Sequence, residues 1–134
     1  MKVLKTTAAV VNLDIVLDFV DSFLEEHDCP IKTQMQIDLS VEEIFVNIAN
    51  YAYSGTPGEA EIRISAADDV VSISFVDSGI PYDPLQKVDP DITLSAEARQ
   101  IGGLGIFLVK KNMDNVSYLY ENGKNMLTIS KKIK

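Results

Sequence analysis

The sequence predicts a two-layer α/β sandwich, with about three helices on one face of a mixed, mostly antiparallel sheet of about five strands. Segments whose apolar residues recur every three or four positions are interspersed with segments in which apolar and polar residues alternate. The expected order is strand, helix, helix, strand, strand, loop, helix, strand, strand. A helix with one apolar stripe and a strand with one apolar face each need a covering layer, so the two kinds of element should pack together.

The length and composition predict one soluble domain spanning residues 1–134. Hydrophobic residues make up 46% of the chain, but no apolar run approaches the roughly 18 residues that a membrane span needs. The N-terminus lacks the pattern of a secretory signal. The single cysteine, Cys29, excludes an internal disulfide and a cysteine-rich metal site. We therefore expect a cytoplasmic protein with no membrane contact.

The formal net charge of −8 bears on the class of partner. A protein that binds nucleic acid directly needs a basic surface to meet the phosphates, so no direct nucleic-acid contact is expected. An acidic chain is compatible with a protein partner that carries basic patches. It is equally compatible with plain solubility.

The N-terminal part is predicted to form one strand and one helix. Residues 2–9 contain several β-branched side chains, which favours a strand. Asn12 is a candidate N-cap for the helix that follows, and Pro30 marks its end, because proline disfavours helical backbone in the residue before it. His27, near that end, is expected to be a terminal residue rather than a catalyst. The predicted core face is Leu13, Val16, Leu17, Val20, Phe23 and Leu24, and the predicted solvent face is Asp14, Asp18, Asp21 and Glu25.

The segment 33–53 is predicted to be a helix with two different faces. Thr33 and Gln36 have the spacing of a capping box at its start. The apolar stripe consists of Ile37, Val41, Ile44, Phe45, Ile48 and Ala52. The polar stripe, turned away from it, consists of Gln36, Ser40, Glu43, Asn47 and Asn50. A carboxylate and two carboxamides aligned beside a core face predict a helix that forms one wall of a polar site.

Two hairpins are predicted in the remainder of the chain. Residues 60–66 and 71–75 alternate apolar and polar side chains on either side of an Asp-Asp turn. Residues 116–121 and 125–130 alternate around Asn-Gly, the strongest short hairpin signal in this sequence.

Between the hairpins we expect a lid and a short helix. Residues 77–100 contain several prolines and little periodicity, which predicts a long loop with a lid at about 83–101 and one helical turn at 95–100. Three glycines then precede the helix, in the run Ile101-Gly102-Gly103-Leu104-Gly105, and the helix has Ile106, Val109 and Met113 on one side.

The glycine run is the first chemical signal. Backbone N–H groups at a helix N-terminus, unobstructed by side chains, can cradle phosphate oxygens. The run is neither a P-loop, because no GK[ST] follows, nor a dinucleotide-binding fingerprint, because no strand directly precedes it. A lid hinge is the alternative explanation.

Two further signals lie elsewhere in the chain. Asp77, at the end of a predicted strand, could accept a hydrogen bond from an exocyclic amine, and Gly79 would let a flat ring approach the backbone; an ordinary Asp-x-Gly turn is the alternative. Glu43 and Asn47 lie one helical turn apart. An asparagine carbonyl suits Mg²⁺, and a nearby carboxylate can deprotonate a hydroxyl or a water. A solvated helix face would also produce this spacing.

Taken together, these signals carry a family resemblance. The segments NIANYAY after Glu43, DSGIPYDP and IGGLGIFLVKKNMD resemble the N, G1 and G2 boxes of the GHKL ATPase superfamily, with its Bergerat ATP-binding fold. More narrowly, the chain resembles bacterial anti-sigma regulatory factors with serine/threonine-protein kinase activity. The resemblance covers essentially the whole chain.

The resemblance implies ATP and Mg²⁺ as the ligands and assigns a role to each site residue. Glu43 takes the position of the general base and Asn47 that of the magnesium ligand. Asp77 takes the adenine-reading position. The other ATP-binding positions implied are Asn50, Gly79, Gly102, Gly103, Leu104 and Gly105.

The resemblance also implies protein partners: a sigma factor that is sequestered, and a STAS-type anti-anti-sigma protein that is phosphorylated on serine or threonine. A homodimer is a further expectation. Three alternatives stay open: a nucleotide-dependent binder without kinase turnover, the ATPase domain of a histidine kinase, and a vestigial site.

Overall fold

The computed structural model describes residues 1–54, 56–86 and 103–134. The expected helical turn at 95–100 and Gly102 lie outside these residues, as does most of the predicted lid. The helices are α1 (Leu13–Glu26), α2 (Ile31–Asn47) and α3 (Gly103–Asn112), and α2 continues as a π-helix, η2 (Ile48–Ala52). Two short 3-10 helices are η1 (Val10–Asn12) and η3 (Pro84–Gln86). The strands are β1 (Lys2–Thr7), β2 (Glu59–Ala67), β3 (Val70–Asp77), β4 (Asn115–Glu121) and β5 (Lys124–Lys132).

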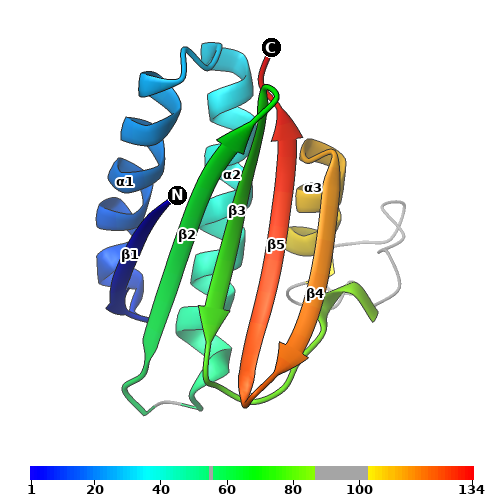
Figure 1. Cartoon of the computed structure of the whole chain (residues 1–134). Coiled ribbons are helices and arrows are strands. Elements are labelled where there is room, and N and C mark those ends of the chain that lie inside the picture. Colours follow the sequence, from blue (N-terminus) through cyan, green and yellow to red (C-terminus); the bar gives the residue numbers. More distant parts are fainter. Residues whose placement is uncertain (55, 87–102) are drawn as a thin grey trace.

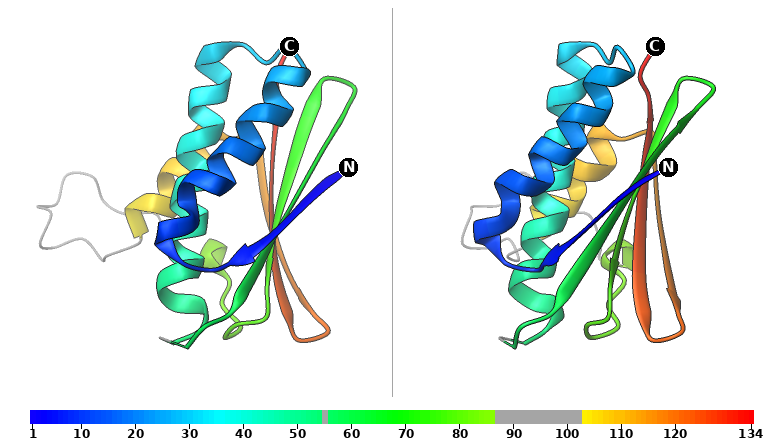
Figure 2. Two further views of the ribbon diagram at one scale, coloured as in Figure 1. Left: turned by 90° about the vertical axis from the view of Figure 1, so that its left-hand side faces the viewer. Right: turned by 60° about the vertical axis from the view of Figure 1, so that its left-hand side comes forward.

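The five strands form one sheet in the order β1-β2-β3-β5-β4, and all three helices lie on one of its faces (Figures 1 and 2). This is the two-layer α/β sandwich that the sequence predicts. The prediction left room for some parallel pairing. All four pairs between the described strands are antiparallel.

Both predicted hairpins form, and their turns have the backbone that right-twisted strands require. Asn122 and Gly123 join β4 to β5 with φ angles of 55° and 75°. Asp68 and Asp69 join β2 to β3 with φ angles of 52° and 63°. Two consecutive positive φ angles define the type I′ turn, which asparagine, aspartate and glycine tolerate best.

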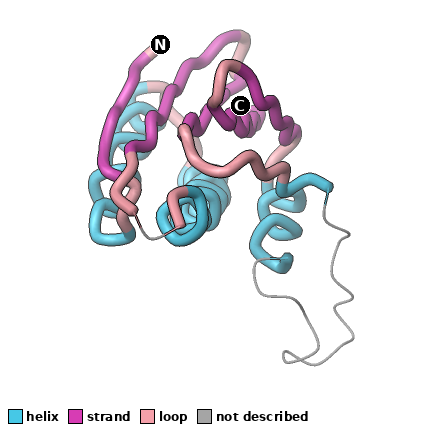
Figure 3. Tube along the Cα trace, turned by 90° about the horizontal axis from the view of Figure 1, so that it is seen from below, coloured by secondary structure: helices cyan, strands magenta, loops and turns pink. Residues whose placement is uncertain are grey.

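The core fills the space between the sheet and the helices. Helix α2 lies in the middle of the helical layer and packs against both α1 and α3 (Figure 3). Its Ile37, Val41 and Phe45 are fully buried, as the predicted apolar stripe requires. The strands contribute alternate residues to the same core: Ile62, Ile64, Val71, Ile73, Phe75, Leu127 and Ile129.

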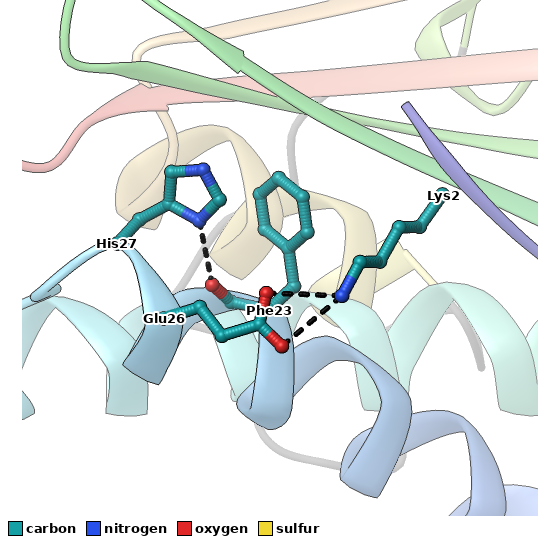
Figure 4. A network of polar contacts seen from close by, with 4 residues as sticks. All are labelled: Lys2, Phe23, Glu26 and His27. Carbon is teal, nitrogen blue, oxygen red and sulfur yellow. Dashed lines mark hydrogen bonds and ion pairs between the residues drawn. The ribbon is translucent and has the colours of Figure 1, made fainter.

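The first helix ends in a Schellman motif. The N–H of Asp28 donates to the carbonyl of Glu25, and the N–H of Cys29 donates to that of Leu24. His27 is the C-cap residue; its Nδ1 lies 2.9 Å from the carbonyl oxygen of Phe23, and its ring stacks on the Phe23 ring (Figure 4). These contacts are those of a helix-terminal residue, in agreement with the expectation from the sequence.

Figure 4 also shows an ion pair between the first strand and the first helix. Lys2 Nζ lies 2.9 Å from Glu26 Oε2. Both side chains are about half exposed, so water and salt screen the pair and it contributes little to stability.

The predicted side-chain caps of the first two helices are wrong, because no side chain accepts a hydrogen bond from the first turn of either helix. Helix α2 begins at Ile31, directly after Pro30, and no side chain caps it, so the predicted box of Thr33 and Gln36 does not form. The fixed φ angle of proline already prepares the chain for a helical turn. Asn12 does stand at the N-cap of α1, but its side chain donates to the carbonyl of Thr7 instead of accepting from the helix.

Ser40, predicted on the polar stripe of α2, and Asp21, predicted on the solvent face of α1, are both buried in the structure, Asp21 through one of its oxygens. Ser40 is 1% exposed and its hydroxyl donates to the carbonyl of Gln36, which satisfies it within the helix. Asp21 of α1 has a buried Oδ1, and so does Asp38 of α2. The interface between α1 and α2 therefore holds a pair of carboxyl groups.

None of the described helices combines the length and the apolar character that crossing a membrane requires.

Candidate nucleotide-binding site

A cavity of about 530 Å³ lies between α2, α3 and the β3-β5-β4 part of the sheet. This volume is within the range of small-molecule sites, roughly 300–1,000 Å³. The apolar lining comes from both layers and from the loop after β3: Ile44, Ile48, Ala52, Phe75, Ile80, Pro81, Pro84, Ile106, Val109 and Leu127. The polar lining consists of Glu43, Asn47, Asp77 and Asn125, with Tyr51, Tyr82 and Tyr118. A small number of polar groups in a mostly apolar cavity is sufficient to fix the orientation of a ligand.

The Glu43 carboxylate lies against the start of α3. A Cβ placed on Gly105 would come 2.4 Å from Glu43 Oε2, so only a glycine leaves room for the acid in this position. Helix α3 starts at Gly103, and the first N–H groups of a helix have no partner within it. The Glu43 carboxylate therefore lies beside the first turn of α3.

Asn47 lines the same cavity one helical turn after Glu43. Both side chains come from the polar stripe of α2, and that of Glu43 reaches α3 at Gly105. Their oxygens provide one carboxylate and one amide, a donor set that suits an ion whose other ligands are waters and phosphates. Within the described parts of the chain, no cluster of three or more His, Cys, Asp or Glu side chains could hold a metal on its own.

Asp77 stands at the end of β3 and is 6% exposed. Its Oδ1 accepts hydrogen bonds from the N–H of Gly79 and from Asn125 Nδ2, both at 2.9 Å. Among the described residues, these two bonds both use Oδ1. The carboxylate also lines the cavity, so Oδ2 is the oxygen that a ligand can use.

The structure shows a packing reason for glycine at position 79, which the sequence did not indicate. A Cβ on Gly79 would lie 2.2 Å from the carbonyl oxygen of Ala52, so the end of η2 fills the space that a side chain at position 79 would need. The next residue, Ile80, donates its N–H to that same carbonyl at 2.8 Å. This close approach joins the loop after β3 to the helix that carries Glu43 and Asn47.

Asn125 is a site residue that the sequence analysis missed. It is 6% exposed, pairs in register with Asp77 across β3 and β5, and lines the cavity. A signal was present in the sequence, because Asn125 alternates with Leu127 and Ile129 on the core-facing side of its strand. A polar residue in that series must be satisfied by a partner inside the fold.

The structure brings some of the predicted site residues together and leaves others apart. Glu43, Asn47 and Asp77 line one cavity, and Gly105 contacts Glu43. Asn50 is exposed and does not line the cavity. Helix α3 begins at Gly103, so Gly103, Leu104 and Gly105 lie in its first turn, whereas the sequence analysis placed the glycines before the helix.

The comparison with protein families is decisive for the class of protein. A family model described as "Histidine kinase-like ATPase domain" matches residues 6–131. The chain belongs to this family. The GHKL character inferred from the three sequence motifs is therefore confirmed.

Curated relatives are named as kinases of serine or threonine. The serine/threonine-protein kinase BtrW of Bordetella bronchiseptica is 29% identical over 74% of this chain and 70% of its own length. The serine-protein kinases RsbW of Listeria monocytogenes and Bacillus cereus are each 29% identical, over 68% and 66% of this chain. The matches span 61% and 58% of these two relatives.

Solved structures show the same fold. The histidine kinase domain of the blue-light activated histidine kinase from Erythrobacter litoralis EL346 has a TM-score of 0.56 at 19% identity, covering 78% of this chain and 46% of that one. The histidine kinase AdeS of Acinetobacter baumannii has a TM-score of 0.57 at 11% identity, covering 100% of this chain and 70% of that one. At these identities the likeness concerns the fold alone.

The residues present fit ATP and Mg²⁺. The cavity is large enough for a small ligand, the Asp77 carboxylate lines it and among the described residues accepts hydrogen bonds through Oδ1, and α3 begins at Gly103 with the kind of helix start that can hold phosphate oxygens. Asn47 and Glu43 supply hard oxygen atoms at that same end.

Proposed function

We propose that this protein is an ATP-dependent serine/threonine kinase that sequesters a sigma factor and phosphorylates a STAS-type anti-anti-sigma protein. The observation that carries the proposal is the position of Glu43. Its carboxylate lies beside Gly105 at the N-terminus of α3, where a phosphate chain would be held. The names of the curated relatives support serine or threonine as the acceptor rather than histidine.

The binding step uses residues at both ends of the cavity. Asp77 accepts a hydrogen bond from the exocyclic amine of adenine through the oxygen that its protein partners leave available. The first N–H groups of α3 donate to the phosphate oxygens. Asn47 contributes a ligand to Mg²⁺, which when bound neutralises charge on the phosphates.

The transfer step moves one phosphoryl group and one proton. The hydroxyl oxygen of the acceptor serine or threonine forms a bond to the γ-phosphorus, and the bond from that phosphorus to the β,γ-bridging oxygen breaks, releasing ADP. Glu43 receives the hydroxyl proton. Because phosphoryl transfer depends mainly on position and charge, a rigid helix that holds Glu43 and Asn47 one turn apart suits this chemistry.

The decisive experiment measures transfer of labelled γ-phosphate to a STAS-domain protein from the native host. Glu43→Gln is expected to lower the transfer rate by roughly 10²- to 10⁴-fold while calorimetry still detects Mg·ATP binding. Glu42→Gln is the matched control, because Glu42 is the exposed neighbour on the same helix and should leave transfer unchanged. Equal labelling by the Glu43→Gln variant would remove the general-base role.

The same experiment separates the alternatives. A nucleotide-dependent binder would retain Mg·ATP affinity and bind a sigma factor without labelling the STAS protein. A histidine kinase domain would give an acid-labile phosphohistidine; His27 packs on Phe23 at the end of α1, away from the cavity-lining residues. A vestigial site would bind no Mg·ATP in the wild-type protein.

A further inference from the structure

Asn125 uses its whole side-chain amide in contacts around Asp77. Nδ2 donates to Asp77 Oδ1 at 2.9 Å and to the carbonyl oxygen of Ile80 at 3.0 Å. Oδ1 accepts from the N–H of Tyr82 at 3.1 Å and from the hydroxyl of Tyr118. A side-chain amide has two donor hydrogens and two acceptor sites, so these four contacts use its full hydrogen-bonding capacity.

The partners determine which way the amide points. The backbone N–H of Tyr82 can only donate, so the atom facing it must be the oxygen. The carbonyl of Ile80 can only accept, so the atom facing it must be the nitrogen. Burial raises the pKa of Tyr118 above its ordinary value of 10.0, which keeps its hydroxyl protonated as the remaining donor.

We propose that Asn125 is the positioning residue that makes Asp77 selective for the amino group of adenine. This inference rests on the proposed function. Asn125 and Gly79 together saturate Asp77 Oδ1, which holds the carboxylate in one orientation with Oδ2 toward the cavity. Through Ile80 and Tyr82, the same amide holds the loop that forms the wall next to Oδ2.

The contacts of Asn125 predict a specific failure when only its Nδ2 donor group is replaced. Asn125→Asp keeps the size of the side chain but places a second carboxylate against Asp77 and against the Ile80 carbonyl. Two like charges at hydrogen-bond distance repel until one of the acids binds a proton. While both acids are charged, Asp77 turns away from the residue at position 125 and no longer presents a fixed acceptor to an amine.

The test compares two nucleotides that differ only in the exocyclic amine. We expect the wild-type protein to bind Mg·ATP roughly 10- to 100-fold more tightly than the triphosphate of purine riboside, because only ATP donates to a charged acceptor. In Asn125→Asp at pH 8, this ratio should fall to near one, as in Asp77→Asn. Purine riboside triphosphate affinity should change little.

The pH dependence gives a second readout. The titratable groups around this position are Asp77, Asp83, Tyr53, Tyr82, Tyr118 and Tyr120. In Asn125→Asp, lowering the pH adds a proton to the carboxyl pair and restores a donor, so the preference for ATP should partly return. In the wild-type protein it should stay level over the same range.

Each outcome decides one question. An unchanged ratio in Asn125→Asp, or an equal loss of both nucleotides, would overturn the positioning role while leaving the proposed function intact. Absence of ATP binding by the wild-type protein would instead remove the proposed function. Asn115→Asp is the charge-matched control, because Asn115 is exposed on β4 and should leave the ratio unchanged.

A second variant covers the case in which Asn125→Asp does not fold. Tyr118→Phe removes only the hydroxyl that donates to Asn125 and keeps the ring at the cavity. The ratio should then fall by about two- to tenfold, the effect of losing one hydrogen bond. A ratio equal to that of the wild-type protein would count against the network.

Discussion

The Oε2 atom of Glu43 occupies the space that a side chain at Gly105 would need, since a Cβ there would lie 2.4 Å from it. The two residues are far apart in the chain and meet where α2 packs against α3. Gly105 therefore has a structural role that is separate from the phosphate-binding role proposed for this glycine run. It makes room for the carboxylate.

Gly105→Ala should lower phosphoryl transfer without lowering the stability of the fold. Gly105 lies inside a helix, where alanine is favoured by roughly 0.5–1 kcal/mol, so the variant should fold and melt no lower than the wild-type protein. The new methyl group would push the flexible end of Glu43 away. Phosphoryl transfer to the STAS protein should fall by about tenfold or more.

A double-variant cycle checks that this loss passes through Glu43. If Gly105→Ala acts by displacing the acid, adding it to Glu43→Gln should cause little further loss of transfer. Multiplying losses would show that Gly105 acts on the nucleotide independently of Glu43.

Asn47→Ala should weaken the dependence of ATP binding on magnesium. Calorimetry with and without Mg²⁺ should show that the ion increases the affinity of the wild-type protein for ATP. In Asn47→Ala this increase should be about tenfold smaller. Asn50→Ala is the informative comparison, because Asn50 is exposed and outside the cavity lining. An equal magnesium defect in Asn50→Ala would restore the predicted role of Asn50 in the site.

Gly79→Ala should destabilise the fold as well as the site. The added Cβ would meet backbone atoms of Ala52 at 2.2 and 2.6 Å, and backbone cannot give way as a side chain does. We expect a loss of about 1–3 kcal/mol in the free energy of unfolding, measured by urea titration, with weaker ATP binding. Ser78→Ala, at the exposed neighbouring position, should change neither quantity.

The carboxyl pair between α1 and α2 should make stability depend on pH. Burial, then the hydrogen bond with Asp21, then the charges of Asp21 and Glu25 raise the pKa of Asp38 from 3.8 to about 8. The folded chain therefore holds this proton at pH values where the unfolded chain has lost it. Stability from this group is complete below about pH 4 and is lost as the pH rises toward 8.

Asp38→Asn removes this titration, because an amide replaces the protonated acid. Chemical denaturation at pH 8 should find the variant more stable than the wild-type protein by about 1 kcal/mol, a modest value because solvent screens a partly exposed group. Cys29, whose pKa is also raised by burial and by Asp38, titrates above this window. Asp18→Asn, on the exposed side of α1, is the control. A wild-type stability that is level between pH 5 and 8 would contradict the shared proton.

Local sequence patterns determined the fold class of this protein. The alternation of apolar residues placed β2, β3, β4 and β5, and Asn122 with Gly123 determined a hairpin turn, because few residues accept two positive φ angles. The apolar stripe of α2 likewise identified the helix that the sheet must cover. These features depend on neighbours within a few residues, which a sequence displays directly.

Contacts between distant segments were decided only by the tertiary structure. Nothing near Asp77 in the sequence indicates that Asn125 will stand opposite it, since strand register places them together. The carboxyl group of Asp21 was expected in solvent, and the packing of α1 on α2 buries one of its oxygens together with one of Asp38. The sequence could propose Glu43 from its spacing to Asn47, but only the approach of α3 puts Gly105 against it. A helix or strand pattern specifies which face is apolar, whereas the polar partner across the interface depends on how whole elements pack.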